Sequence, residues 1–172
     1  MQEDVRDVLS AFQWDFLMIA HPPCTRLCNS GVRWLKTPPP GRTLEEMWHE
    51  LDEGAALFSD LWNADVPHVA VENPVMHKYA KSRIVNYEPF AQSVQPWEFA
   101  QRDADADNVK KRTCLWLRNL PKLERTGSLD GTTARAECHN ASPSPDRWKL
   151  RSRFYEGIAD ARASQWGAII GV

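Results

Sequence analysis

The fold is decided by the stretch DFLMIAHPP at residues 15–23, in which an unbroken apolar run ends in a pair of prolines. A short apolar run that is bounded by a turn is typical of a buried strand. Proline cannot continue a hydrogen-bonded ladder or enter the interior of a helix. We therefore predict a buried strand over residues 15–20, followed by a rigid loop at residues 22–31.

The next segment with a clear pattern predicts a helix over residues 43–63. Its apolar side chains recur at intervals of three and four residues, which is the spacing of one helix face. Thr43 and Glu46 stand three residues apart at its start and match a capping box, in which each side chain bonds to the backbone N–H of the other. The helix therefore has a defined beginning as well as an apolar face.

A second apolar run, VPHVAVE at residues 66–72, is closed by Asn73 and Pro74 and predicts a second strand. Strand, helix and strand in this order form the βαβ unit of a parallel sheet, with a right-handed crossover. The loops at residues 22–31 and 72–77 should then leave the same carboxyl edge of the sheet. Open α/β sheets bind ligands at that edge.

The rest of the chain is predicted to complete an α/β fold with mostly parallel strands flanked by helices, in a single domain over residues 1–172. The further elements are a short helix over residues 75–83, strands over 92–99 and 112–117, a long loop at about 121–146, and a helix over 154–166 that Gly167 stops. Loops of that length in a compact domain often have a binding role.

Composition limits the class of protein. The chain has 172 residues, of which 42% are hydrophobic, and a formal net charge of −2. No segment approaches the roughly 20 apolar residues that cross a bilayer, and the N-terminus lacks the basic start and apolar run of a signal peptide. We therefore expect no membrane partner, a cytoplasmic location, and four cysteines that remain reduced thiols.

Basic side chains are concentrated in the second half of the chain. A net charge near zero argues against coating nucleic acid by bulk electrostatics, but local clusters of arginine and lysine can grip phosphate. A solvated face with exposed ion pairs is the alternative interpretation. The candidate phosphate-binding residues are Lys111, Arg112, Arg147, Arg151 and Arg153.

Two side chains at the predicted carboxyl edge could carry chemistry. Cys24 follows the first strand in a loop stiffened by two prolines, and Glu72 ends the second strand. A cysteine is a nucleophile when a neighbour lowers its pKa, because the thiolate is the reactive form. A simply buried structural cysteine is the alternative. We predict that Cys24 and Glu72 face one another across the edge of the sheet.

Zinc binding is another use of these thiols. His21, Cys24 and Cys28, together with Cys138 and His139, contain suitable ligand types but in poor spacings for a zinc site. We therefore expect no metal.

The segments FLMIAHPPCT at residues 16–25 and AVENP at residues 70–74 resemble, in this order, the Pro-Pro-Cys and Glu-Asn-Val motifs of DNA cytosine-5 methyltransferases. Short methyltransferase-like proteins of bacteriophages resemble nearly the whole chain. The matching segments are CNSGVRW at 28–34, ENPVMHKY at 72–79, QPW at 95–97, TCLWL at 113–117 and SPDR at 144–147. This resemblance implies a truncated Rossmann-like methyltransferase sheet, and action in the host cytoplasm if the chain is phage-encoded.

The resemblance also implies a chemistry. Cys24 would be the nucleophile that adds to carbon 6 of cytosine, and Glu72 would hold and protonate the ring. DNA or a pyrimidine nucleotide would be the partner, and a base in duplex DNA would have to be flipped out. The residues expected to line the base site are Pro22, Pro23, Thr25, Asn29, Ser30, Asn73, Pro74 and Trp97, the last by stacking.

S-adenosylmethionine is the cofactor that the resemblance implies, and its site is expected to be incomplete. These methyltransferases bind it with a glycine-rich turn after their first strand, whereas the residues before position 15 here contain no such turn. Three hypotheses stay open: a methyltransferase, an inactive phage protein that binds a nucleotide or nucleic acid, for example in counter-defence, and a subunit completed by a partner chain or a second copy.

Overall fold

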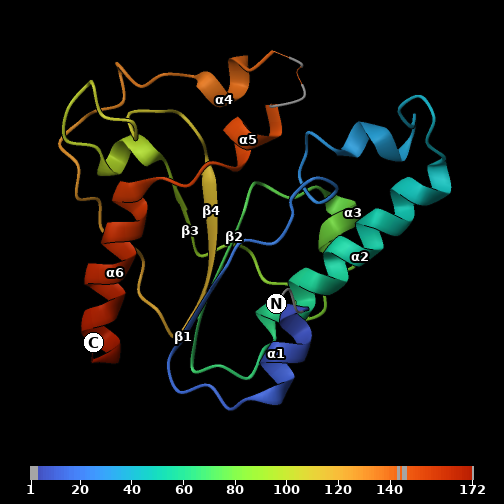
Figure 1. The fold of residues 1–172 in the computed structure, drawn as a ribbon, viewed down its shortest axis with the longest axis horizontal. Helices are drawn as coiled ribbons and strands as arrows, with labels where there is room; N and C mark the ends of the chain where they lie inside the picture. The colour runs from blue at the N-terminus through green and yellow to red at the C-terminus, as the bar shows by residue number, and fades with distance from the viewer. Residues whose placement is uncertain (1–3, 143, 145–146, 172) are drawn as a thin grey trace. The chain divides into compact units, whose positions relative to one another are not determined.

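The structure is a computed structural model that describes residues 4–142, 144 and 147–171. The chain divides into two compact units, where the sequence led us to expect one domain over residues 1–172. The first unit comprises Met1–Gln92 and Cys114–Leu120, and the second comprises Ser93–Thr113 and Pro121–Val172. The described residues contain a four-stranded sheet and several helices, as in a mixed α/β fold (Figure 1).

The βαβ unit predicted from the sequence is confirmed in the first unit. β1 (Leu17–Ala20) pairs in parallel with β2 (His68–Asn73), and α2 (Leu44–Trp62) connects them. The capping box is present, because Thr43 Oγ1 accepts from Glu46 N at 3.1 Å while Glu46 Oε2 accepts from Thr43 N at 2.7 Å. The loops that follow β1 and β2 therefore start at the same edge of the sheet.

The prediction that the first strand is buried is only partly right. Phe16, just before β1, is 53% exposed and Ile19 within it is 40% exposed, while Ala20 is buried. β1 stands at one end of the strand order β1-β2-β4-β3, in which β4 is Thr113–Arg118 and β3 is Gln92–Val94, so its side chains are less covered than those of the inner strand β2. An apolar run indicates a strand, but it does not show whether that strand is inner or outer.

The prediction of a mostly parallel sheet is wrong, because the sheet is mostly antiparallel. β4 (Thr113–Arg118) runs antiparallel to β2, with Asn73 opposite Cys114. Parallel neighbours need a crossover connection, usually a helix, whereas the chain between β2 and β4 holds only the four-residue helix α3 (Lys78–Lys81), the short strand β3 (Gln92–Val94), the 3₁₀ helix η2 (Pro96–Phe99) and irregular loops. An apolar run such as TCLWL identifies a buried strand and carries no information about its direction.

β3 is shorter than predicted. It covers Gln92–Val94 and gives way to the 3₁₀ helix η2 (Pro96–Phe99), where the sequence predicted a strand through residue 99. Pro96 is the cause, because it has no N–H for the ladder and its fixed φ suits the first position of a helix.

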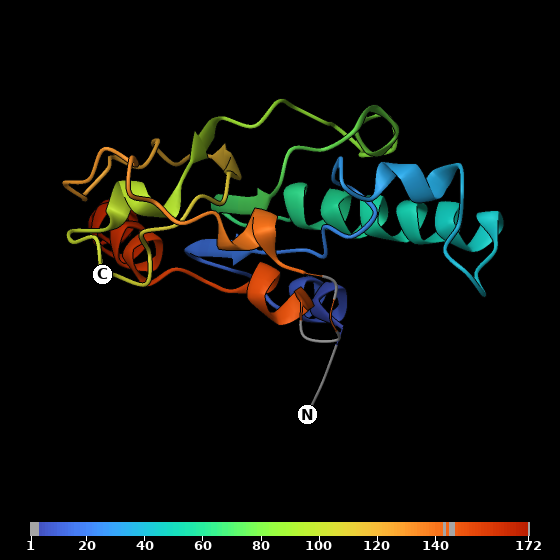
Figure 2. The ribbon, with the colours of Figure 1, turned by 90° about the horizontal axis from the view of Figure 1, so that it is seen from above.

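The core of the first unit lies under α2. Trp116 of β4 is buried between the rings of Phe58 and Phe90, with ring centroids 5.2 Å and 5.8 Å away, and its Nε1 donates to Glu88 O at 2.7 Å. The 3₁₀ helix η1 (Val32–Leu35) and α3 (Lys78–Lys81) both pack against α2 (Figure 1 and Figure 2). α3 confirms a short helix within residues 75–83. η1 and α1 (Val5–Ala11), which Asp4 caps, had no counterpart in the prediction.

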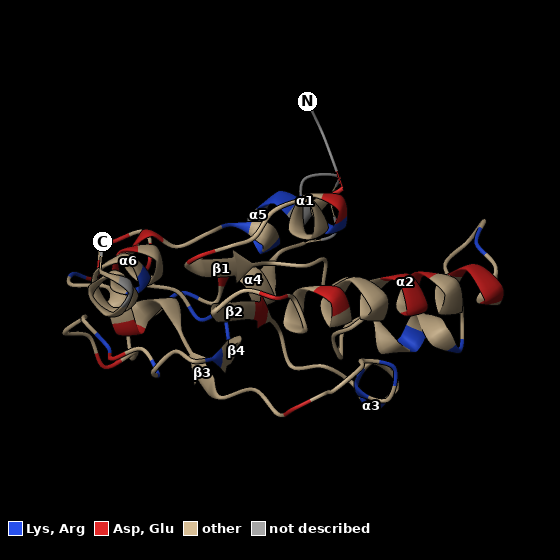
Figure 3. Ribbon diagram, turned by 90° about the horizontal axis from the view of Figure 1, so that it is seen from below, with Lys and Arg blue, Asp and Glu red and all other residues tan. Residues whose placement is uncertain are grey.

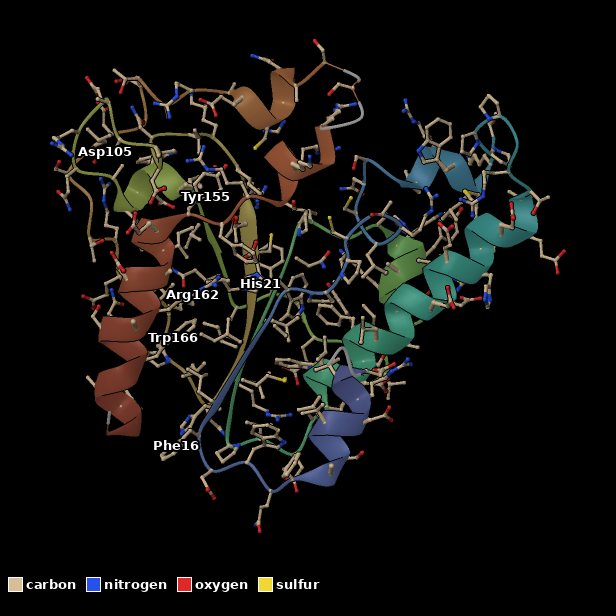
Figure 4. The ribbon with its side chains drawn as sticks, in the orientation of Figure 1. Phe16, His21, Asp105, Tyr155, Arg162 and Trp166 are labelled. Atoms are coloured by element: carbon tan, nitrogen blue, oxygen red, sulfur yellow. The ribbon has the colours of Figure 1, made fainter. Side chains whose placement is uncertain are left out.

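The second unit contains the last helix, α6 (Glu156–Ile170), which continues beyond the predicted end. Gly171, with φ +79°, caps it in the left-handed conformation, whereas Gly167 lies inside the helix. Tyr155 stands immediately before α6, and Arg162 and Trp166 follow along the helix (Figure 4). Trp166 Nε1 donates to Pro121 O at 3.1 Å, so the irregular chain after residue 120 packs against this helix.

The long loop predicted at about residues 121–146 is irregular up to α4 (Glu137–Asn140). Residues 143, 145 and 146 of that loop lie outside the described residues. α5 (Arg147–Ser152) follows it, a short helix that the sequence did not predict. Across the part of the chain that the structure describes, no helix is long and apolar enough to cross a membrane.

Candidate functional site

The carboxyl ends of β1 and β2 bring the two motif loops together. We call residues 21–31 the PPC loop and residues 72–77 the ENP loop. Because Ala20 pairs with Val71, His21 and Glu72 come next to one another at this edge; the first two residues of the ENP loop are also the last two of β2. His21 Nδ1 lies 2.8 Å from Glu72 Oε2, with both side chains about three-quarters or more buried. Figure 4 shows His21 at the end of β1.

Asn73 provides the second link between the loops. Its Nδ2 donates to Pro22 O at 3.1 Å, and the residue is only 1% exposed. Its Oδ1 is buried and has no hydrogen-bond partner among the described residues. In this structure Asn73 and Pro22, both expected to line a base site, therefore hold the two loops to one another.

Further along, the two loops run antiparallel. Asn29 N donates to Val75 O at 3.3 Å, and His77 N donates to Leu27 O at 3.1 Å. Cys28 and Met76 form the antiparallel bridge between these bonds. The loops therefore form one hydrogen-bonded structure.

His77 links the end of the ENP loop to the PPC loop and to α3 by two side-chain hydrogen bonds. Its Nε2 donates to Arg26 O at 2.6 Å, and its Nδ1 accepts from Ala80 N at 3.1 Å at the start of α3. Gly31 is needed at the end of the PPC loop because a Cβ there would lie 2.2 Å from Thr25 O. The hydrogen bonds of His77 and the close approach of Gly31 to Thr25 O both require the chain to fold back closely on itself.

The two cysteines of the PPC loop lie on one helical turn. Leu27 N and Cys28 N both donate to Cys24 O at 3.1 Å. The Cys24 thiol hydrogen-bonds to the Cys28 sulfur, and Ser30 Oγ lies 3.0 Å from that sulfur. Cys24 is half-buried, whereas Cys28 is 5% exposed. The turn thus places an accessible thiol against a buried one.

The thiol with the lowered pKa is Cys28. Hydrogen bonds from Cys24, from the Ser30 side chain and backbone, and from the Gly31 N–H lower the pKa of Cys28 to about 5, against the opposing effect of burial. From the sequence, the only chemical role weighed for Cys28 was that of a zinc ligand with poor spacing. The spacing Cys-x-x-x-Cys was the available signal, since it places both side chains on consecutive turns of a helical segment.

The remaining loop residues expected at a base site differ in exposure. Pro23, Thr25, Asn29 and Ser30 are exposed on the PPC loop, and Pro74 is half-buried. These side chains are therefore accessible from solvent around Cys24.

Trp97 belongs to the second unit. It lies in η2, where its ring covers Gly131, and a Cβ at that glycine would come within 2.7 Å of the ring. The guanidinium carbon of Arg125 lies 5.6 Å from the ring centroid. Trp97 is thus packed within its own unit.

The five candidate phosphate-binding residues also lie in the second unit. Lys111 Nζ donates to Arg153 O at 2.9 Å and lies 5.2 Å from the centroid of the Tyr155 ring. Arg112 Nε donates to Ser93 Oγ at 3.0 Å. The other two, Arg147 and Arg151, are one helical turn apart on α5, whose basic residues Figure 3 shows in blue.

A hollow of about 460 Å³ lies at the opposite edge of the sheet in the first unit. Three segments line it: the residues just before β1, the connection from α2 to β2, and the end of β4. Among the lining residues are Trp14, Asn63, Asp65, Arg118 and Asn119. The Arg118 guanidinium donates to Trp62 O and Val66 O there. The sequence did not predict this hollow, and it contains none of the motif residues.

Two ligand types can be tested against the described residues. No group of three or more histidine, cysteine, aspartate or glutamate side chains among them is arranged to hold a metal ion. The described residues before β1 form α1 and an irregular segment that contains no glycine. The described residues before β1 thus contain no glycine-rich turn of the kind that the resemblance implies for S-adenosylmethionine.

Comparisons with protein-family models, curated proteins and solved structures give no match for this chain. The site is therefore interpreted from its own geometry and from the resemblance of its two motifs.

Proposed function

We propose that the chain is a DNA cytosine-5 methyltransferase-like protein that recognises a pyrimidine base with the PPC and ENP loops. The observation that carries this proposal is the hydrogen bond from Asn73 Nδ2 to Pro22 O. It joins the two motifs of the resemblance, which are about fifty residues apart, at one edge of the sheet. The contact between His21 and Glu72 supports the same arrangement.

The proposed chemistry is a reversible addition to the base. The Cys24 thiol loses its proton to solvent and its sulfur forms a bond to carbon 6, while the 5,6 double bond breaks and its electron pair moves through carbon 5 into the ring. Glu72 in its acid form donates a proton to ring nitrogen 3 and so stabilises the adduct. Carbon 5 takes a proton from water, and the hydroxide that remains removes the original carbon 5 hydrogen. The sulfur then leaves carbon 6 as a thiolate that solvent protonates, and nitrogen 3 returns its proton to Glu72, which restores cytosine.

His21 is the group placed to serve Glu72. Its Nδ1 lies 2.8 Å from Glu72 Oε2, so a proton can pass between the two side chains without a rearrangement of the loops. This series of reaction steps needs no cofactor, and its net result is exchange of the hydrogen on carbon 5 with solvent.

The proposed partner is DNA or a pyrimidine nucleotide, with Lys111, Arg112, Arg147, Arg151 and Arg153 contacting phosphate. Contacts of this kind weaken as salt concentration rises. By the same resemblance, the chain would act as a phage protein in the host cytoplasm.

A second candidate function is binding without turnover. The observation that favours it is that the described residues before β1 contain no glycine-rich turn, because a base site can hold a nucleotide without a cofactor. This candidate keeps the contacts of Glu72 and the loops, and assigns no covalent role to Cys24.

Hydrogen exchange separates the two candidates. A cytosine-containing oligonucleotide, single-stranded or duplex, is incubated in D₂O with the full chain, and deuterium at carbon 5 is measured by mass spectrometry. We expect exchange with the wild type and with Cys138→Ser, which alters a half-buried thiol of the second unit. With Cys24→Ala and Glu72→Gln we expect at least a tenfold loss, within the range that a positioned acid or base supplies.

The outcomes are distinct. No exchange together with equal oligonucleotide affinity of the wild type and Cys24→Ala supports binding without turnover. If the wild type shows no exchange and no binding of the oligonucleotide, the proposed function is overturned.

A further inference from the structure

Cys24 and Cys28 form a pair of thiols that the base chemistry does not require. The proposed addition uses one sulfur, yet the structure places a second within hydrogen-bonding distance of it. Positions four apart on a helical turn rise by about 6 Å. This separation lies inside the range of about 4.4–6.8 Å between the Cα atoms of a disulfide.

We propose that Cys24 and Cys28 form a dithiol site that reduces low-molecular-weight disulfides by thiol–disulfide exchange and closes into a disulfide within the PPC loop. This activity goes beyond the proposed function, because it requires neither a base nor a cofactor.

The difference in burial assigns the order of the two sulfurs. Cys24 is half-buried and accessible to a small disulfide, whereas Cys28 is 5% exposed. Cys24 therefore attacks first. Its sulfur bonds to one sulfur of the substrate RSSR and passes its proton to Cys28, the substrate S–S bond breaks, and RS⁻ leaves.

The second step closes the loop. The Cys28 sulfur loses its proton to the departed RS⁻ and attacks the Cys24 sulfur of the mixed disulfide, and the second RS⁻ leaves and takes a proton from water. The net reaction converts the Cys24 thiol, the Cys28 thiolate, RSSR and one water molecule into the Cys24–Cys28 disulfide, two RSH and hydroxide, so that the protein is oxidised by two electrons and the substrate is reduced by two.

The surroundings of Cys28 suit this second role. The Ser30 hydroxyl lies 3.0 Å from its sulfur, and the backbone N–H groups of Ser30 and Gly31 also point to it. These donors favour the thiolate and remain in place after Cys24 has formed the mixed disulfide. The Cys24 thiol, whose hydrogen bond contributes most to the lowered pKa of Cys28 in the reduced protein, no longer donates at this stage, so these remaining donors are the groups that favour the Cys28 thiolate.

The other two cysteines serve as internal controls. Cys114 is fully buried in β4, and Cys138 is half-buried with its Sγ 3.6 Å from Tyr155 Oη. Neither belongs to the turn that pairs Cys24 with Cys28.

The test uses the reduced full chain and glutathione disulfide as the probe. After incubation, remaining thiols are blocked by alkylation and the chain is mapped by peptide mass spectrometry. We expect the wild type to form the Cys24–Cys28 disulfide, and we expect the same of the control variant Cys138→Ser. Cys28→Ser should instead stop at glutathione bound to Cys24. Ser30→Ala, which removes one hydrogen bond to Cys28, should slow closure about three- to tenfold.

A wild type that carries glutathione on Cys24 and does not close overturns the proposal, and so does reaction of Cys114 or Cys138 as fast as Cys24. Circular dichroism shows whether each variant is folded. The wild type alone gives a second measurement, since a trivalent arsenical that bridges two sulfurs should protect Cys24 and Cys28 together from alkylation. The result does not depend on carbon 5 exchange, so either proposal can fail while the other stands.

Discussion

The link between the two loops can be broken by a single substitution, Asn73→Ala. The change removes the donor to Pro22 O, a hydrogen bond worth about 0.5–1.5 kcal/mol net. It also leaves the carbonyl oxygen of the buried Pro22 without its hydrogen-bond donor, which lowers the free energy of unfolding by a further amount of about 1–3 kcal/mol. Loss of the buried Oδ1, which has no partner among the described residues, offsets part of this cost. We expect the free energy of unfolding to fall by about 2 kcal/mol.

Urea unfolding followed by tryptophan fluorescence measures this difference. Asn29→Ala is the matched control, because it makes the same change on an exposed side chain of the PPC loop and should cost less than about 0.5 kcal/mol. Under native conditions, Cys24 in Asn73→Ala should also be alkylated faster than in the control. If both variants unfold at the same urea concentration as the wild type, the Asn73 amide does not hold the loops together.

Three further outcomes follow from the same structure, each checked by urea unfolding. Gly31→Ala should destabilise by about 2 kcal/mol or more because its Cβ would lie 2.2 Å from Thr25 O, whereas Gly54→Ala inside α2 should stabilise by about 1 kcal/mol; equal effects would contradict this. Thr43→Ala, which removes the helix cap, should cost about 1 kcal/mol, and an unchanged midpoint would show that the capping box contributes nothing. The folded state lowers the pKa of Cys28 from 9.0 to about 5, so its thiolate stabilises the fold fully above pH 9 and loses that effect as pH falls through 5. The wild type should therefore gain stability over Cys28→Ser between pH 5 and pH 9 in the presence of a reductant, and a constant difference would refute this.

The βαβ unit was predictable because its signals are local. Thr43 and Glu46 are three residues apart, and the apolar face of α2 repeats every three or four residues. Both patterns act within one or two helical turns, so a single sequence is enough to place the helix and, from it, the parallel pairing of β1 with β2.

The rest of the fold depends on distant partners. The run that forms β4 has the same pattern in a parallel or an antiparallel strand, and its direction is fixed only when it pairs with β2. Gly167 was predicted to stop α6, but it lies inside the helix. The left-handed φ of Gly171 shows that this glycine ends the helix.

The sequence predicted that the ends of the first two strands meet at one edge, because parallel neighbours share their carboxyl end, and that Cys24 faces Glu72 there. The structure places His21 Nδ1 against Glu72 Oε2, a contact that was not predicted. The bond between Asn73 and Pro22 was not predicted, since nothing in either local segment specifies a side chain–backbone contact across fifty residues. Cys28 was undervalued for a similar reason, because its pKa depends on the conformation of the whole PPC loop.

The antiparallel pairing of the PPC and ENP loops also has a consequence for folding order. Its hydrogen bonds join residues fifty positions apart, such as Leu27 and His77, with all of α2 between them. Closing so long a segment costs chain entropy before any bond forms, so these contacts should form late and be the first to open. In a refolding experiment, Cys28 should become protected from alkylation only after α2 has formed, which makes this thiol a natural probe of the last folding step.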